Sequence, residues 1–177
     1  MKRLYLLRHA KAVAAGHGLR DEDRVLAERG RADAVRIGQF LGEEGYRPDV
    51  VLCSPSARTR ETFDLILPRL AARPHILHPR ELYLARAATL FDAVLQTRDA
   101  AGSVMIVAHS PGIEECALAL ARAPAERKRR RQHQAMAEKF PTGALAVIDF
   151  EASHWRAVAP GEGELVLFIR PGDLRGE

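Results

Sequence analysis

The sequence is poor in cysteine, with only Cys53 and Cys116 among 177 residues. A chain of this length buries roughly two-thirds of its unfolded surface, so it needs no disulfide to stabilise its core. We therefore expect two reduced thiols in the interior. No cluster of cysteine and histidine has the spacing of a zinc site, and the sequence predicts neither a metal nor another cofactor.

Long hydrophobic runs are also missing. The first apolar stretch covers only Leu4–Leu7 before Arg8 interrupts it, which is too short for a secretory signal or a membrane span. No later run reaches spanning length, and no repeat or low-complexity linker divides the chain. We therefore expect a single domain over residues 1–177, located in the cytoplasm and without a membrane partner.

Positively charged residues outnumber negatively charged residues only slightly. The 27 Lys and Arg residues against 23 Asp and Glu residues give a formal net charge of +4, which favours anionic ligands without identifying one. The strongest charge feature is the run Arg127–Arg131. Because no aromatic residue alternates with these cations, we interpret the run as a solvated helix face rather than a nucleic-acid surface. A docking surface for an acidic protein near the site entrance is a further alternative.

Short β-rich apolar runs alternate with amphipathic helical stretches along the chain. This pattern is typical of a mainly parallel sheet with helices on both faces, so it predicts an α/β fold with three αβα layers. The expected strands cover residues 4–8, 49–53, 75–77, 103–108, 144–150 and 164–169. The expected helices cover residues 27–44, 54–70, 86–98, a stretch from 110 onward, and 125–138.

Individual residues support these boundaries. Gly45 is suited to end the first long helix, and Ser110 with Pro111 is suited to begin another, with the serine as cap. A polar turn region around Trp155 and Gly161 is expected to join the last two strands. His17, His75, His78, His133 and His154 follow no pattern, and we interpret them as surface or packing residues.

Three polar clusters follow directly after predicted strands. They are Arg8-His9, the segment 54–60, and His109-Ser110. The carboxyl ends of parallel strands lie at one edge of a sheet, beside helix N-termini, where ligands bind. We therefore expect these clusters to converge on one site although they are far apart in the sequence.

Histidine and arginine in these clusters suit phosphoryl transfer. A histidine with one unprotonated ring nitrogen can act as a nucleophile, and His9 is the candidate. Arginine binds phosphoryl oxygens with a planar fork that stays charged, and Arg8 and Arg58 are the candidates, with Arg60 as a further one. His109 would add a donor if it were protonated. This combination predicts phosphoryl transfer without a metal ion.

Four motifs of the sequence resemble those of the histidine phosphatase superfamily, which includes the cofactor-dependent phosphoglycerate mutases. They are Arg8-His9-Ala10-Lys11, Leu26-x-Glu28-Arg29-Gly30, Ser54-Pro55-Ser56-x-Arg58-Thr59-x-Glu61-Thr62 and Ala108-His109-Ser110-Pro111-Gly112. The first motif, the compact length and the segment 140–144 resemble the SixA-type phosphohistidine phosphatases in particular. The resemblance extends to about residue 171 and implies a phosphoglycerate mutase-like fold with no metal cofactor.

The resemblance also implies roles for the residues in these motifs. His9 would carry the phosphoryl group in a covalent intermediate. Arg8 and Arg58 would bind the phosphoryl oxygens, and His109 would bind them from the other side. Lys11 would be a further substrate-binding residue.

Two other candidates carry a weaker signal. Ser110, next to His109 in its motif, is a candidate for substrate binding. Glu81 is the candidate general acid, because family members place a carboxylate after the third strand, although a surface glutamate is an equal alternative. A histidine leaving group departs as neutral imidazole, so it demands less of an acid than an alkoxide does.

We therefore expect a phosphatase that acts on phosphohistidine in a protein of the histidine-phosphotransfer type. The chain is too short for a large lid, and an open site suits a bulky protein side chain, whereas small metabolites gain from enclosure. A phosphomonoesterase acting on a small phosphorylated substrate is the first alternative. A non-catalytic module that binds phosphorylated partners or nucleic acid is the second. The small apolar stretch 12–18 and Val25, where relatives often carry an aromatic residue and a proline, leave the substrate preference open.

Overall fold

The computed structural model describes residues 1–16 and 18–175, so His17 lies outside the described residues. One six-stranded sheet forms the centre, with the strand order β3-β2-β4-β1-β5-β6. The strands are β1 (Lys2–Arg8), β2 (Val50–Cys53), β3 (His75–Leu77), β4 (Ser103–Ala108), β5 (Leu145–Phe150) and β6 (Glu164–Ile169). The strands β1 to β4 pair in parallel, whereas β5 pairs antiparallel with both of its neighbours, β1 and β6. The predicted α/β fold with a mainly parallel sheet is confirmed.

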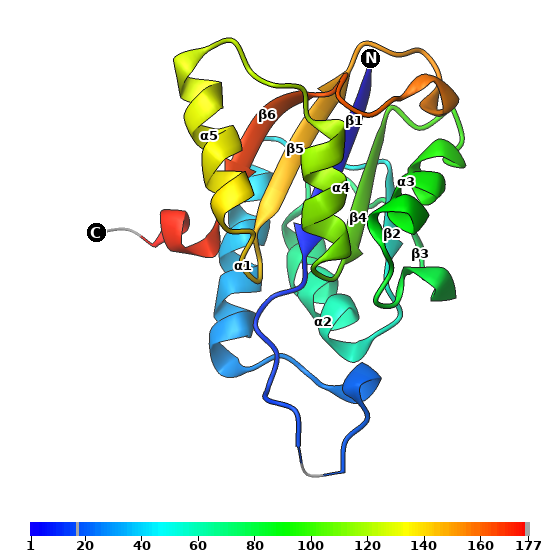
Figure 1. Cartoon of the computed structure of the whole chain (residues 1–177). Coiled ribbons are helices and arrows are strands. Elements are labelled where there is room, and N and C mark those ends of the chain that lie inside the picture. The colour runs from blue at the N-terminus through cyan, green and yellow to red at the C-terminus, as the bar shows by residue number, and fades with distance from the viewer. Residues whose placement is uncertain (17, 176–177) are drawn as a thin grey trace.

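Helices cover both faces of this sheet (Figure 1). The α-helices are α1 (Glu28–Glu43), α2 (Ala57–Ile66), α3 (Ala87–Leu95), α4 (Gly112–Leu120) and α5 (Arg127–Glu138). Short 3-10 helices are η1 (Asp21–Asp23), η2 (Leu67–Arg69), η3 (Arg80–Leu82), η4 (Trp155–Ala157) and η5 (Pro171–Leu174). The helices α1 and α2 lie behind the sheet in this view, and α3, α4 and α5 lie in front of it.

The alternation of side chains along each strand builds one core on each face. In β1, Leu4 and Leu6 point to the core under α3, α4 and α5, whereas Tyr5 and Leu7 point to the core under α1 and α2. The unbroken apolar sequence of the central strands is therefore explained by burial on both sides. Both cysteines are free and buried, as expected, and burial raises the pKa of each thiol to about 12.

The helices begin and end within four residues of the expected bounds; α2, for example, covers residues 57–66 where 54–70 was expected. Gly45 follows α1 with a φ of 71°, the left-handed conformation that ends helices, and Ser56 caps α2 by accepting from Thr59 N. The expectation that Ser110 caps α4 is wrong. The helix begins at Gly112 with Pro111 in the cap position, so the Ser110 hydroxyl lies one residue too early and contacts the Glu114 carboxylate at 3.2 Å instead.

The connection before β6 is also less polar than expected. Trp155 begins η4 and is fully buried in the core rather than lying in a solvated turn. Its indole Nε1 donates to the Ala101 carbonyl at 2.9 Å, and its backbone N–H donates to Asp99 at 2.7 Å. Because the indole N–H has a hydrogen-bond partner, the large ring can be buried. The polar residues around Trp155 in the sequence gave no indication of this burial.

The basic run 127–131 forms the first turns of α5, as predicted. Arg129 pairs with Glu126 and Glu164, whereas Arg127, Lys128, Arg130 and Arg131 are exposed. In Figure 1, α5 begins at the end of the sheet opposite the carboxyl end of β1. The alternative of a docking surface near the site entrance does not fit this placement. Among residues 1–16 and 18–175, no helix is both long and apolar enough to span a bilayer.

Candidate active site

The three polar clusters meet at one edge of the sheet because β2, β4 and β1 are neighbours. Arg8 is in register with Ala108, so His9 and His109 follow side by side at the ends of β1 and β4. The His9 backbone N–H donates to the Ala108 carbonyl at 3.1 Å, and the two imidazole centroids are 5.3 Å apart. The segment between β1 and α1 extends past this edge of the sheet (blue in Figure 1).

The tautomer of His9 is fixed by its own chain neighbour. Its Nδ1 lies 2.7 Å from the Ala10 carbonyl oxygen, which can only accept, so Nδ1 carries the proton and Nε2 is unprotonated. Burial chiefly lowers the pKa of His9 to about 4, and the nearby cations Arg58, Arg8 and Arg24 lower it further, against the Ala10 hydrogen bond. The ring is therefore neutral at physiological pH, with a free lone pair.

The second histidine is neutral as well. Burial chiefly lowers the pKa of His109 to about 3, with His9 and Arg58 as the next causes. Its Nδ1 lies 3.3 Å from Arg58 Nη2, which can only donate, so the proton is on Nε2, 2.7 Å from Ser54 Oγ. His109 is therefore neutral, and the expectation that it would add a protonated donor is not supported.

Arg58 is buried, and one residue occupies both of its terminal nitrogens. Its Nη1 donates to the Asp21 carbonyl oxygen at 2.6 Å, and its Nη2 donates to Asp21 Oδ2 at 2.9 Å. The Tyr83 hydroxyl donates to the same Oδ2 at 2.6 Å, and Arg24 Nη1 donates to Oδ1 at 2.8 Å. The hydrogen bond from Tyr83 chiefly holds the pKa of Asp21 well below its usual range, with Arg24 and Arg58 contributing.

Arg8 enters the site from the end of β1. Its Nη1 donates to the Phe140 carbonyl oxygen at 2.7 Å, and Gly143 N donates to the carbonyls of both Arg8 and His9. In the part of the chain that the structure describes, Arg8 Nε is a buried side-chain nitrogen without a hydrogen-bond partner. Burial lowers the pKa of Arg8, and the nearby Glu114 carboxylate opposes that shift. An unpaired buried donor beside His9 fits an incoming anion.

Other motif residues fix the backbone around His9. Thr62 Oγ1 accepts from Ala10 N at 3.0 Å, and the Glu61 carboxylate accepts from Leu26 N at 2.7 Å. A Cβ on Gly30 would overlap the Lys11 carbonyl oxygen, so only glycine permits this close approach of α1. These motif residues thus hold the backbone near His9 against α2 and against the start of α1.

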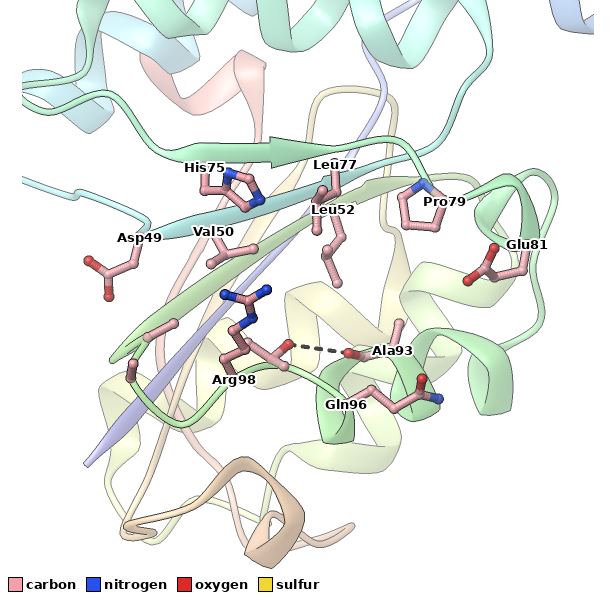
Figure 2. A pocket seen from close by; sticks show the side chains of 13 residues that line it. Asp49, Val50, Leu52, His75, Leu77, Pro79, Glu81, Ala93, Gln96 and Arg98 are labelled. Atoms are coloured by element: carbon pink, nitrogen blue, oxygen red, sulfur yellow. Dashed lines mark hydrogen bonds between the residues drawn. The ribbon is translucent and has the colours of Figure 1, made fainter.

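Four of the predicted residues do not contact the imidazoles. The side chain of Lys11 is exposed, and Ser110 binds Glu114 as described above. Arg60 is exposed and lines a surface pocket with Arg20 and Asp23, so the expectation of a further fork there is not supported. Glu81 lines a separate pocket of about 580 Å³ between β2, β3 and α3, together with His75 and Arg98 (Figure 2).

The structure adds residues that the sequence patterns did not single out. The turn after η3 directs Tyr83 rather than Glu81 toward the site, with the phenol ring 5.6 Å from the His109 ring and at right angles to it. Asp21 and Arg24 come from the segment between β1 and α1. The only sequence signal for them is a dense group of charges at residues 20–24, which is equally typical of a solvated turn.

The lowered histidine pKa values predict the response to acid. We expect His9 and His109 to remain neutral at pH 5, where an unperturbed histidine with a pKa of 6.5 is mostly protonated. NMR titration of the imidazoles, assigned with single His→Ala variants, would show this directly; midpoints near 6.5 for both rings would contradict it.

The same shifts link pH to stability. The unfolded chain binds more protons than the folded chain between about pH 3 and 6.5, so these two groups contribute their full stability above pH 6.5. That contribution is lost as the pH falls below 6.5 and through about 4 for His9 and about 3 for His109. Denaturant unfolding at pH 7 and pH 5 measures the decrease, and it should be smaller in the His109→Ala variant.

Comparisons with known proteins agree with this geometry. The family model of the histidine phosphatase superfamily (branch 1) matches residues 4–80. An uncharacterized protein of Mycobacterium tuberculosis is 33% identical over 171 residues, covering 93% of this chain and 99% of the relative.

Two solved structures share the whole fold. One, from Agrobacterium tumefaciens and solved as a candidate phosphohistidine phosphatase SixA, has a TM-score of 0.77 and 35% identity, covering 97% of this chain and 99% of that chain. Another candidate SixA, from Nakamurella multipartitia, has a TM-score of 0.81 and 28% identity, with 96% of each chain covered.

Proposed function

Because this chain belongs to the histidine phosphatase superfamily and is a phosphatase of the SixA type, we propose that it hydrolyses phosphohistidine on a protein through a covalent intermediate on His9. The observation that carries the proposal is the fixed tautomer of His9. The hydrogen bond of Nδ1 to the Ala10 carbonyl leaves Nε2 unprotonated, and the charges of Arg58 and Arg8 are close enough to lower the pKa of the ring. A neutral imidazole beside two arginines has the nucleophile and the charge that phosphoryl transfer requires.

In the first step, Nε2 of His9 forms a bond to phosphorus as the P–N bond of the substrate breaks. The electron pair of that bond stays on the substrate ring. A ring that carries a proton on its other nitrogen departs as neutral imidazole, so no enzyme acid has to supply a proton. Arg8 and Arg58 bind the phosphoryl oxygens, and the buried Nε of Arg8 gains a partner.

In the second step, water attacks the phosphorus of phosphorylated His9. The Nδ1 proton remains on the ring, held by the Ala10 carbonyl at 2.7 Å, so His9 also departs as neutral imidazole. Inorganic phosphate leaves with the water oxygen, and the protons of water pass to phosphate and solvent. In both steps, therefore, the leaving group is a neutral imidazole that keeps the proton on its other ring nitrogen.

The ionised state of Asp21 favours a phosphoramidate over a phosphate ester. Asp21 stays ionised because its pKa is well below the usual range, so it is a poor proton donor. Glu81 lies in the separate pocket, and its role as general acid remains a prediction. An alkoxide leaving group needs a proton, whereas an imidazole leaving group does not.

The surroundings of the site support a protein substrate. Leu19 and Val25 are 54% and 42% exposed on the segment between β1 and α1, and Leu84 is 54% exposed beside Tyr83. The Tyr83–Asp21 hydrogen bond brings these two segments together. We infer that these side chains, on the two segments that flank the site, would contact a protein substrate.

A substrate comparison tests this proposal. We expect the kcat/KM for a phosphorylated histidine-phosphotransfer protein to exceed that for an aryl phosphate by about 100-fold or more, since the imidazole needs no acid and the protein adds contacts. Release of phosphate is followed for both substrates, with the His9→Ala variant as background. A small phosphate ester that is hydrolysed more efficiently than the phosphoprotein would instead favour a phosphomonoesterase.

A further inference from the structure

Asp21 binds both terminal nitrogens of Arg58. The carbonyl oxygen of Asp21 binds one terminal nitrogen, and its carboxylate binds the other. We propose that Asp21 is a resident anion of the phosphoryl site, whose carboxylate the phosphoryl group of the substrate must replace on Arg58. This inference rests on the proposed role of Arg58 as a phosphoryl-binding residue.

The burial of the ion pair explains why Asp21 is there. The Arg58 side chain is 4% exposed, so its charge needs a counter-charge close by, while the Asp21 side chain is 43% exposed. In the described part of the chain, Asp21 is the carboxylate that forms a salt bridge with Arg58. The Asp21 carboxylate therefore neutralises the buried charge of Arg58.

Both N–H groups of Arg58 Nη2 are in use, one toward Asp21 and one toward His109, and Nη1 also donates to Asp21, so a phosphoryl group can bind both terminal nitrogens only where Asp21 withdraws. Two parallel N–H···O bonds are the arrangement in which arginine binds either a carboxylate or a phosphate. Placing two anions on one guanidinium adds repulsion at short distance, where the buried surroundings screen it weakly. Binding of phosphate therefore includes the cost of moving the Asp21 carboxylate away.

Asp21 has partners that can hold it after this exchange. Arg24 binds its other carboxylate oxygen, and Arg24 is itself fixed by two bonds to the Val13 carbonyl, at 3.0 and 2.8 Å. The Tyr83 hydroxyl binds Oδ2 from the opposite segment. The Asp21 carboxylate can thus leave Arg58 and keep its hydrogen bonds to Arg24 and Tyr83, and this makes the exchange reversible.

The exchange gives the site a preference among phosphoryl compounds. Free inorganic phosphate has only the phosphoryl contacts with which to displace Asp21. A phosphorylated protein gains further contacts at the apolar residues beside the site, and these offset the cost of displacement. Asp21 is therefore a specificity-determining residue that weakens binding of free phosphate.

The test is the Asp21→Asn variant, which keeps the size of the side chain and removes its charge. We expect its dissociation constant for inorganic phosphate, measured by isothermal titration calorimetry, to fall about tenfold, as does the Ki of phosphate against an aryl phosphate. Asp23→Asn is the matched control: Asp23 lies in the same short helix, pairs with the exposed Arg20, and does not contact Arg58. Its dissociation constant should change by less than about twofold.

The sign of the change separates this inference from general damage. A variant with a disordered loop or a misplaced Arg58 binds phosphate more weakly, so unchanged or weaker binding in Asp21→Asn overturns the proposal. Asp21→Ser, which is also uncharged, must show the same tightening if the asparagine variant is poorly folded by thermal melting.

The failure of this inference and the failure of the proposed function are distinguishable. If Arg58→Ala binds phosphate as tightly as the natural sequence does, the phosphoryl site itself is misassigned. If Arg58→Ala loses binding while Asp21→Asn gains none, only the role of Asp21 is wrong. Neither measurement requires phosphohistidine as the substrate.

Discussion

Replacing His9 by alanine is expected to lower phosphatase turnover by at least about 10⁴-fold, because the variant has no atom that can take up the phosphoryl group. The loss should appear in kcat with both a phosphoprotein and an aryl phosphate, since both depend on the same nucleophile. The natural protein, quenched during turnover, should carry an acid-labile phosphoryl label on a histidine. His9→Ala should carry none.

The fold should survive this substitution. Within the described residues, the His9 side chain makes one hydrogen bond, to the carbonyl of the next residue, and its backbone contacts with Ala108 and Gly143 do not depend on the side chain. We therefore expect a change in unfolding free energy of about 1 kcal/mol or less. His75→Ala, at an exposed position of the edge strand β3, is the control that should leave turnover unchanged. Residual activity in His9→Ala above about 1% would mean that another group, or water, attacks the phosphorus directly.

The second large effect is expected at Arg58. Replacement by alanine removes the buried fork and should lower kcat/KM by about 10³-fold, the range in which a single arginine stabilises a phosphoryl-transfer transition state. Lysine should restore only part of this loss, because an ammonium group is a point charge and cannot form two parallel bonds to one phosphoryl group. Steady-state kinetics with an aryl phosphate measures both variants.

A matched control lies two positions further along the same helix. Arg60 is exposed on α2 and contacts neither histidine nor Asp21, so Arg60→Ala changes the net charge by the same amount outside the site. Its kcat/KM should stay within about twofold of the natural value. A comparable decrease in both variants would indicate that overall charge, rather than the position of Arg58, governs the rate.

The central part of the site could be predicted because it depends on topology. Arg8, His9 and His109 lie at the carboxyl ends of parallel strands, which an α/β pattern places at one edge of the sheet, and their backbones are joined by strand hydrogen bonds. Arg58 follows β2 by one helical turn and points back to the same edge. Alternation of strands and helices is visible in the sequence, so this convergence is too.

The outer part of the site depends on side-chain placement that no periodicity encodes. Asp21 contacts Arg58 across 37 positions of sequence, and only the path of an irregular segment determines that contact. At η3, burial of Leu82 turns Glu81 toward the separate pocket and leaves Tyr83 to reach Asp21. A shift of the helix by one residue would change which of these side chains faces the site. The sequence carries no signal for the position of so short a helix.

The neutral state of the histidines was equally hidden. Whether His109 is protonated depends on how deeply its ring is buried and on its distance from Arg58, 3.3 Å from Nη2 to Nδ1. Composition and spacing give neither quantity. The net charge of the site is therefore a property of the folded molecule. Counting the histidines of the motifs as cations overestimates the positive charge of the site.

The close approach of Ala85 to Gly112 has a practical meaning for protein engineering. A Cβ at position 112 would overlap the Ala85 carbonyl, and Leu84 beside it adopts a φ of 49°, so the wall that presents Tyr83 has a backbone path that tolerates little redesign. The opposite wall, residues 11–16 and 18–26, reaches the rest of the site through side-chain hydrogen bonds such as those from Arg58 and Tyr83 to Asp21. Attempts to retarget this scaffold to other phosphorylated proteins should therefore diversify that second wall and leave the first as it is.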